Sequence, residues 1–186
     1  MKPIYKFNNG NKATLCTQCN IVIEEDFTSR VFCDKCKHIT IYLPIGLPAS
    51  GKSTWAKKFV KDNFRTIIVS RDSIREMFHG EYKYVPHLES LITDVLYDTA
   101  TYLLLFEYSI ILDATNLNKD RTHSFVYSGL VEDMYYSVPS LRVDVIEKDF
   151  TDVPVTECIR RDRERNRSVG EEVIRSFYEK YILPTK

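Results

Sequence analysis

A glycine-rich segment contains the residues of this chain that are best suited to chemistry. Residues 46–54 read Gly-Leu-Pro-Ala-Ser-Gly-Lys-Ser-Thr and match the pattern G-x-x-x-x-G-K-[ST]. The glycines let the backbone curve tightly, so that successive N–H groups point inward and hold phosphate oxygens. In this pattern Lys52 reaches the β- and γ-phosphates of a nucleoside triphosphate, and Ser53 binds Mg²⁺. We therefore predict a nucleotide site formed by Gly46, Ser50, Gly51, Lys52, Ser53 and Thr54.

This segment does not select a reaction, because ATPases, GTPases and small kinases share it. The chain has no guanine-specifying N-K-x-D motif, and 186 residues leave little room for the coupling domains of a mechanical ATPase. A phosphotransferase needs three further parts: a base for the acceptor hydroxyl, a clamp for phosphate charge and a lid. The sequence offers a candidate for each part.

The candidate base is Asp72, which follows the apolar run 66–69. The carboxyl end of a parallel strand faces the active-site crevice, where a carboxylate can accept a proton from an attacking hydroxyl. Arg71 and Arg75 flank Asp72 and can hold substrate phosphates, because guanidinium groups match phosphate oxygens. The alternative is that Asp72 only caps a short helix.

The candidate clamp and lid is the run 160–167, which contains five arginines and two acids. An arginine that reaches the transferring phosphoryl group raises the rate by orders of magnitude. Within the run we assign Arg161 and Arg165 to nucleotide binding, and Arg165 also to catalysis, together with Lys52 and Asp72. The alternative for many of these arginines is a solvated helix face with i,i+4 charge pairs.

Asp113 is a candidate second ligand for Mg²⁺. It ends the apolar run 109–112, and an acid at the end of an apolar strand fits the second magnesium position of such nucleotide-binding enzymes. The alternative is an ordinary polar residue at a strand end.

Four of the five cysteines form two Cys-x-x-Cys pairs that are thirteen residues apart. Two such pairs can place four thiolates around one tetrahedral zinc ion. The alternative is a set of reduced free thiols, and the fifth cysteine, Cys158, is expected to be a small buried side chain. We predict structural zinc bound by Cys16, Cys19, Cys33 and Cys36.

The positions of the elements predict an α/β fold, in which a parallel sheet is flanked by helices. Strands are expected over 39–45, 66–69, 109–113 and 141–146, and helices over 52–62 and 73–78. Two further helices are expected to begin near Pro154 and at a capping box formed by Ser168 and Glu171. We predict a zinc-ribbon-like module over residues 1–38, with a small hairpin of 21–23 and 27–32, and a second domain over residues 39–186. A long helix is expected to bury Leu88, Leu91, Ile92, Val95, Leu96, Leu103 and Phe106, and the last helix to bury Val173, Ile174, Phe177, Tyr178 and Tyr181.

Composition excludes several classes of protein. Lys and Arg number 26, as do Asp and Glu, so nucleic-acid binding would need a local basic patch. No apolar run reaches the roughly 18 residues of a membrane span, and the start of the chain lacks the apolar region of a signal peptide. We therefore expect no membrane partner and a cytoplasmic protein, in the host cytoplasm if the gene belongs to a phage.

Beyond the nucleotide motif, several short motifs resemble the P-loop kinases that include bacteriophage polynucleotide 5′-hydroxyl kinase. The resemblance runs from about residue 40 to 183. Three departures from it are Ala114, where that kinase has Asp, the absence of a phosphatase D-x-D-G-T motif, and the four-cysteine module at the front of the chain. The matching motifs are Trp55 after the phosphate loop, Arg71-Asp72 with Arg75, Glu81-Tyr82-Lys83-Tyr84, Asp98-Thr99-Ala100, Thr115-Asn116-Leu117-Asn118 and Asp152-Val153-Pro154.

The resemblance implies a P-loop kinase fold, with ATP as donor and Mg²⁺ as cofactor. It implies that Asp72 is the general base and that Arg165 is a lid arginine on the donor phosphates. On the acceptor side it implies Arg75 at a phosphate and Arg71 beside the entering nucleotide, with Thr115 and Asn116 also at the acceptor.

Together these residues predict an ATP-dependent kinase that phosphorylates a hydroxyl of nucleic acid, with the 5′-hydroxyl of DNA or RNA as acceptor and DNA favoured as partner. An alternative acceptor is the hydroxymethyl group of a modified pyrimidine within DNA, of the 5-hydroxymethyluracil type. A small-molecule kinase and a non-catalytic nucleotide-binding adaptor are weaker alternatives, and the sequence leaves the oligomeric state open.

Overall fold

A four-stranded parallel sheet organises the larger part of the chain. The computed structural model describes residues 5–6, 12–15, 22–24, 38–81, 83–139 and 141–185. The strands β4 (His38–Ile45), β5 (Thr66–Val69), β6 (Ser109–Leu112) and β7 (Arg142–Asp149) lie in the order β5-β6-β4-β7. All three neighbouring pairs are parallel, with Ile41 opposite Ile110 and Val145. The predicted α/β architecture is confirmed for this part of the chain.

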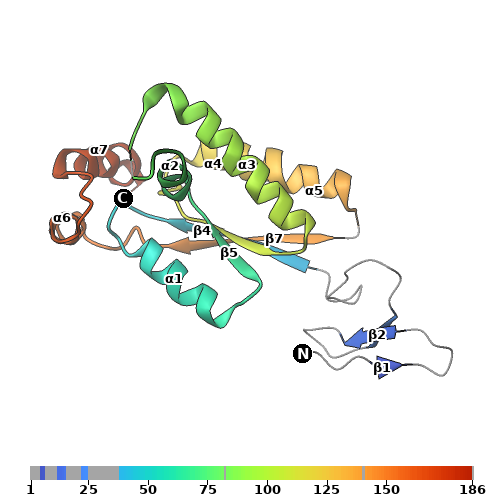
Figure 1. Cartoon of the computed structure of the whole chain (residues 1–186). Coiled ribbons are helices and arrows are strands. Elements are labelled where there is room, and N and C mark those ends of the chain that lie inside the picture. The colour runs from blue at the N-terminus through green and yellow to red at the C-terminus, as the bar shows by residue number, and fades with distance from the viewer. Residues whose placement is uncertain are drawn as a thin grey trace.

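Helices cover both faces of this sheet, as a parallel sheet requires. On one face lies α1 (Lys52–Asp62), and on the other lie α3 (Glu89–Leu105), α4 (Lys119–Phe125) and α5 (Glu132–Ser137), joined by the π-helical segment η2 (Val126–Val131) (Figure 1). The remaining helices are α2 (Arg71–His79), α6 (Val155–Glu164) and α7 (Glu171–Tyr181), with 3-10 turns η1 (Pro86–Leu88) and η3 (Leu183–Thr185).

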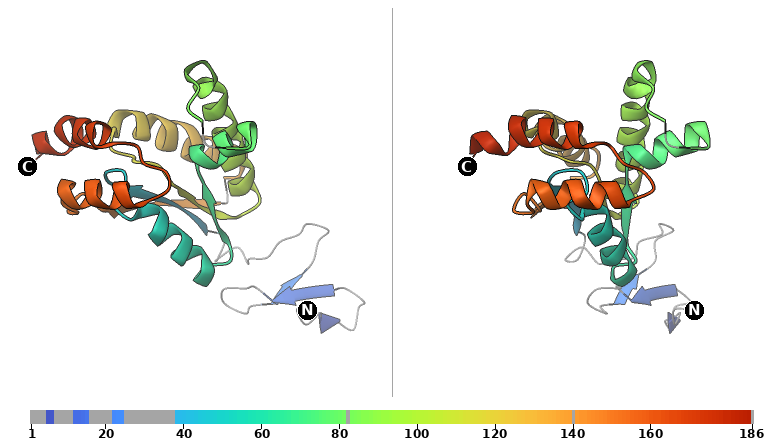
Figure 2. Two further views of the ribbon diagram at one scale, coloured as in Figure 1. Left: turned by 60° about the vertical axis from the view of Figure 1, so that its left-hand side comes forward. Right: turned by 90° about the vertical axis from the view of Figure 1, so that its left-hand side faces the viewer.

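The ends of β4 and β7 point toward α6 and α7, and Figure 2 shows these two helices side by side at that end of the sheet. One core cluster fills the space between the sheet and α3, α4 and α5. A second lies beneath α6 and α7, and contains the buried Cys158 as predicted. The loops at the carboxyl ends of the strands are therefore held on packed elements.

Three short strands in the first part of the chain form a separate antiparallel sheet. They are β1 (Tyr5–Lys6), β2 (Lys12–Leu15) and β3 (Val22–Glu24), in the order β1-β2-β3. Residues 22–24 of the predicted hairpin form β3, which pairs with β2. Of the residues of that hairpin, 21 and 27–32 lie outside the described residues.

The apolar stripe of the long helix differs from the prediction. Ile92, Leu96, Ala100 and Leu104 form the buried row of α3, whereas Leu91 is 48% exposed and Phe106 is 66% exposed. Four-residue steps keep side chains on one helix face, so the small Ala100 belongs to the row that a search for large residues does not select. Likewise Val173 of α7 is exposed, while Ile174 is buried.

Two helix starts also differ from the prediction. In α2, the Ser70 side chain accepts a hydrogen bond from the Asp72 N–H, so Ser70 is the cap and the helix begins two residues earlier than predicted. The capping box at Ser168 is wrong, because Gly170 precedes the first residue of α7 and Ser168 bonds elsewhere. Ser168 instead donates to Asp162 of α6, and Glu171 pairs with Arg163 of α6 and with Arg175 of its own helix.

Within the described ranges, no helix is both long and apolar enough to cross a lipid bilayer.

Candidate active site

The phosphate loop connects β4 to α1 and has the backbone that the motif predicts. Gly51 has φ 105°, in the left-handed region, which favours glycine. At Gly46, a Cβ atom would lie 2.9 Å from the Phe150 Cβ, so only glycine lets these two segments approach. The Gly46 N–H donates to the Thr115 carbonyl at 3.0 Å, which joins the loop to the segment after β6. The N-terminus of α1 therefore opens toward the carboxyl edge of the sheet, where it favours an anion.

Lys52 is buried beneath this loop. Its Nζ donates to the carbonyls of Gly46 at 2.9 Å and Leu47 at 2.6 Å. Burial lowers the pKa of Lys52 to about 8, although the charge of Asp113 opposes the shift; the positive charge of Arg165 adds to it. Lys52 and Arg165 therefore lie within electrostatic reach of each other, as expected for two residues that share a phosphate ligand.

We expect the affinity of the chain for MgATP to fall above pH 8. The folded pKa of about 8 lies below the ordinary 10.5, so Lys52 loses its charge in this range unless bound phosphate restores it. Binding should then take up a proton, and affinity should fall up to about tenfold per pH unit. Calorimetric titrations at pH 8 in two buffers of different ionisation enthalpy measure that proton. Lys58→Gln, an exposed change on the same helix, is the control; an affinity that stays constant from pH 7 to 9.5 would contradict this expectation.

Ser53 and Asp113 supply a pair of oxygen ligands beside the loop. The Asp113 N–H donates to the Val69 carbonyl at 2.9 Å, which places Asp113 directly after β6. Burial raises the pKa of Asp113, while a hydrogen bond from Ser53 and the charge of Lys52 oppose that rise. Carboxylate and hydroxyl oxygens are hard ligands of the kind that Mg²⁺ takes. The pair therefore fits the magnesium site that the sequence predicts.

Asp72 lies at the start of α2 between two arginines. Arg75 Nη1 donates to Asp72 Oδ1 at 2.6 Å, and Arg167 contacts Oδ2 from the loop between α6 and α7. The negative charge of Asp72 also contributes to the raised pKa of Asp113. Asp72 therefore lies close to the oxygen ligands, although the two carboxylates are 41 positions apart in the sequence.

Glu89, the first residue of α3, holds Arg75 in place. Its carboxylate accepts from Arg75 Nε at 2.9 Å and from Nη2 at 2.6 Å, and it lies 4.0 Å from Arg71 Nη1. The hydrogen bond from Arg75 is the main reason why the pKa of Glu89 is lowered. Most of the Arg75 donor capacity is thus used by Glu89 and Asp72.

The loop between α6 and α7 is built around a buried carboxylate. Asp162 is 1% exposed and accepts from Ser168 Oγ at 2.5 Å, from the Val169 N–H at 3.0 Å and from the Gly170 N–H at 3.0 Å. It also pairs with Arg165. These bonds keep Arg165 and Arg167 at the cavity, so the arginine run is more than a solvated face.

Arg161 of α6 reaches the phosphate loop. Its Nη1 lies 3.4 Å from the Ser50 carbonyl, and its Nε donates to Glu157 at 2.7 Å. Arg160 pairs with Glu157 and Glu164 on the exposed side of α6, as the alternative reading of the run predicts. Some arginines of the run 160–167 therefore lie at the nucleotide site, and others form ion pairs on the surface of α6.

Asn116 is engaged by the sheet. Its Nδ2 donates to the carbonyls of Pro44 and Leu112, both at 3.0 Å, so it ties β4 to β6. The preceding Thr115 supplies the carbonyl that holds Gly46. A role of either residue at the acceptor stays a prediction.

One cavity of about 540 Å³ brings most of these groups together. It is lined by predicted residues that are far apart in the sequence, and by three further charged residues that were not predicted. Arg167 had a signal, since it ends the arginine run, whereas Glu89 and Arg121 are single charged residues without a spacing pattern. The predicted residues that line the cavity are Lys52, Ser53, Arg71, Asp72, Arg75, Asp113, Thr115, Asn116 and Arg165, and the added ones are Glu89, Arg121 and Arg167.

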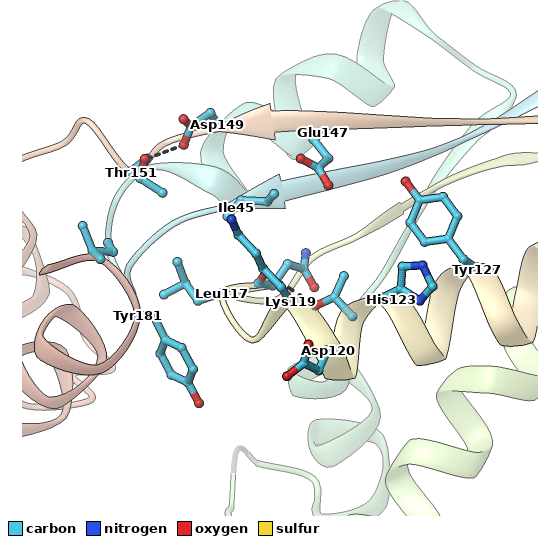
Figure 3. A pocket seen from close by; sticks show the side chains of 13 residues that line it. Ile45, Leu117, Lys119, Asp120, His123, Tyr127, Glu147, Asp149, Thr151 and Tyr181 are labelled. Atoms are coloured by element: carbon cyan, nitrogen blue, oxygen red, sulfur yellow. Dashed lines mark hydrogen bonds between the residues drawn. The ribbon is translucent and has the colours of Figure 1, made fainter. Parts of the chain in front are cut away.

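A second cavity, of about 590 Å³, lies between α4, the ends of β4 and β7, and Tyr181 (Figure 3). Lys119 projects into it toward Ile45, and His123 stacks on Tyr127 with ring centroids 4.9 Å apart. The phosphate loop does not line it.

The four predicted zinc ligands, Cys16, Cys19, Cys33 and Cys36, lie outside the described residues, so zinc binding stays a prediction. Among the residues that are described, no group of three or more His, Cys, Asp or Glu side chains is arranged to hold a metal ion.

Comparisons with known proteins find similarity over the larger part of the chain. The sequence pattern of the AAA domain family matches residues 41–184. L-seryl-tRNA(Sec) kinase of Methanococcus maripaludis is 29% identical over 147 residues, which are 75% of this chain and 51% of that protein. The chain therefore spans about half the length of this curated relative.

Solved structures show the same architecture. A chain of the Pnkp1/Rnl/Hen1 RNA repair complex matches with a TM-score of 0.55 and 28% identity, over 78% of this chain and 43% of that one. A fungal RNA kinase matches with a TM-score of 0.52 and 16% identity, over 78% and 65% of the two chains, and shows likeness of fold alone.

Proposed function

The chain belongs to the AAA domain family, and from this membership and the cavity we propose that it is a P-loop kinase that transfers the γ-phosphate of ATP to a hydroxyl of nucleic acid, with the 5′-hydroxyl end of RNA as acceptor. The observation that carries this proposal is the shared cavity, in which the phosphate loop faces a carboxylate flanked by arginines. A non-catalytic nucleotide-binding adaptor would need the phosphate loop but not the carboxylate and the arginines that flank it.

The residues of the cavity fit the parts of a phosphoryl transfer. The acceptor oxygen forms a bond to the γ-phosphorus, the bond from that phosphorus to the bridging oxygen of ADP breaks, and Asp72 takes the hydroxyl proton. A carboxylate has about four lone-pair sites, so Asp72 can accept this proton while Arg75 stays bound. Lys52 and Arg165 would meet the negative charge on the donor phosphates.

Ser53 and Asp113 would hold the magnesium ion that accompanies ATP. The ion neutralises charge on the phosphate oxygens when it is bound. The chain itself orients the nucleotide through the loop N–H groups and the buried Lys52.

A polyanionic acceptor is supported by the charge of the cavity. Six cations line it, namely Lys52 and five arginines, against the three carboxylates of Asp72, Glu89 and Asp113, in a chain whose net charge is zero. Tyr84, Phe125, Phe177 and Tyr181 also line it and offer rings for base stacking. The cavity is thus the local basic patch that a neutral chain needs for nucleic acid.

RNA is proposed in place of DNA because of the named relatives. The RNA repair complex at 28% identity and the seryl-tRNA kinase at 29% both carry RNA in their names. The preference for DNA that was predicted from the sequence has no such support. The second of these relatives also favours a second acceptor, which is the hydroxyl of a serine attached to tRNA.

We further propose that residues 1–38 form a zinc-ribbon-like module and that residues 39–186 form the kinase domain. The support is the spacing of the four cysteines and the start of the family match at residue 41.

Transfer of labelled γ-phosphate from MgATP to four acceptors tests the kinase. The acceptors are RNA with free 5′-hydroxyl ends, DNA with the same ends, end-blocked DNA with hydroxymethyl pyrimidines, and seryl-tRNA with blocked ends. We expect label on the RNA ends at the highest rate. Label on seryl-tRNA alone would select the second acceptor, label on the modified DNA alone would select the base-modifying kinase, and label on none of the four would refute the proposal.

A further inference from the structure

The arginines that line the cavity differ in their carboxylate partners. Arg71 lies 4.0 Å from Glu89, and Arg75 is bonded to Glu89 and Asp72. On the lid side, Arg165 pairs with Asp162 and Arg167 with Asp72. Each of these arginines thus has a carboxylate partner within the protein.

Arg121 differs from them. It is the third residue of α4, and its backbone N–H donates to the Asn118 side chain. Arg121 lines the cavity, and within the described part of the chain its guanidinium makes no hydrogen bond or ion pair. A cation that lines a cavity and has no carboxylate partner of its own has its hydrogen-bonding groups available to a ligand.

Arg121 shares the cavity with Arg71, which the resemblance places beside the entering acceptor. Burial lowers the pKa of Arg71, and repulsion from Arg75 and Arg121 lowers it further, so Arg121 is within electrostatic reach of Arg71. Phe125, one helical turn after Arg121, lines the same cavity. Lys52 and Ser53 of the phosphate loop line this cavity as well.

We propose that Arg121, together with Arg71, forms a phosphate-binding subsite that takes a phosphodiester of the acceptor strand beyond the reacting nucleotide. This inference rests on the proposed function, because it names a feature of that acceptor. Arg75 cannot supply the whole contact, since its donors are shared between Glu89 and Asp72. An anion between Arg71 and Arg121 would also relieve the repulsion of two like charges. The subsite makes the enzyme select acceptors that carry phosphodiesters over phosphate-free acceptors.

Lys119 provides a matched control for Arg121. It lies two residues earlier on the same helix and is also cationic, but it lines the second cavity and not the first (Figure 3). Arg121→Gln and Lys119→Gln therefore each remove one positive charge from α4, but from different cavities.

Kinetics with a short single-stranded acceptor test the subsite. We expect Arg121→Gln to raise the acceptor KM about tenfold and to reduce the slope of log(1/KM) against log salt by about 0.7, the value for one phosphate contact on a single strand. The maximal rate and the KM for MgATP should stay within about twofold of wild type. Lys119→Gln should change none of these, and a phosphate-free nucleoside should bind equally to all three proteins.

Equilibrium binding separates this inference from the proposed function. The Kd of a labelled oligonucleotide, measured by anisotropy without ATP at several salt concentrations, requires no turnover. An Arg121-dependent affinity and salt slope in a wild-type protein that phosphorylates nothing would keep the subsite and refute the kinase. An unchanged Kd and slope in Arg121→Gln, or a defect confined to MgATP, would overturn the subsite; thermal unfolding of each variant confirms that it is folded.

Discussion

Replacing Asp72 by Asn is expected to lower turnover about 10³-fold while the affinity for MgATP stays within about twofold. A positioned general base contributes about 10²–10⁴ in rate, and Asn keeps the shape of Asp but cannot take the hydroxyl proton. The loop N–H groups and Lys52 bind the donor, whereas the hydrogen bonds of Asp72 in the described part of the chain go to Ser70, Arg75 and Arg167. The loss should therefore fall on the chemical step and not on nucleotide binding.

Single-turnover transfer from MgATP, with nucleotide binding measured separately, checks this expectation. Glu76→Gln is the matched control, because Glu76 lies one turn further along α2 with its side chain exposed. The Asp72 side chain is 45% exposed, so its ion pairs with Arg75 and Arg167 contribute little to stability. A variant that keeps the wild-type rate would remove Asp72 from the mechanism.

Replacing Asp162 by Ala is expected to lower the free energy of unfolding by about 3 kcal/mol. The change leaves the N–H groups of Val169 and Gly170, together with Arg165, without the acceptor that holds them. Breaking a buried hydrogen-bonded ion pair costs about 3–5 kcal/mol, and the 40% exposure of Arg165 places this case at the low end. Turnover should fall too, because Arg165 and Arg167 lose the loop that positions them.

Urea unfolding of the two proteins measures this difference. Glu164→Ala is the control, since Glu164 lies on the same helix and pairs with Arg160 at the surface. We expect its effect to stay below about 1 kcal/mol. Equal stability of Asp162→Ala and Glu164→Ala would show that Asp162 does not hold the loop.

The contribution of Asp162 should also depend on pH. Burial alone would raise its pKa, but the hydrogen bonds from Ser168, Gly170 and Val169 and the charge of Arg165 outweigh burial, so the pKa lies below the usual 3.8. A carboxyl whose pKa is lower in the folded state stabilises the fold above the unfolded pKa, and this stabilisation is lost as pH falls through the folded value. The gap in unfolding free energy between wild type and Asp162→Ala should therefore narrow below about pH 4.

Local signals in the sequence determined the strands, the phosphate loop and the first helix. The bounds predicted for α1 and β5 match the structure at both ends, because each depends on residues within a few positions of one another. The loop carries its own backbone requirements at Gly46 and Gly51, so its course was also predictable. The continuous helical stretch from α4 to α5 was not predicted.

The predictions from the sequence were wrong where a side chain bonds to or packs against a residue of another element. Ser168 and Glu171 have the spacing of a capping box, yet Ser168 donates to Asp162 and Glu171 pairs with Arg163 and Arg175. The bond to Asp162 and the pair with Arg163 reach residues of α6, and no local spacing predicts them, whereas Arg175 lies four residues after Glu171 in the same helix. The same holds for the row of α3, where packing against the sheet selected the small Ala100.

For the candidate site, the sequence determined which residue types were available, and the tertiary structure decided which of them meet. The motif named Lys52 and Ser53, and the strand ends pointed to Asp72 and Asp113. The partners of the arginines came only from the fold: Arg167 contacts Asp72 across 95 positions, Arg75 is bonded to Glu89, and Arg121 lines the cavity without a carboxylate partner among the described residues. The physical reason is that a charge acts through its distance to other charges, and only the folded chain sets those distances.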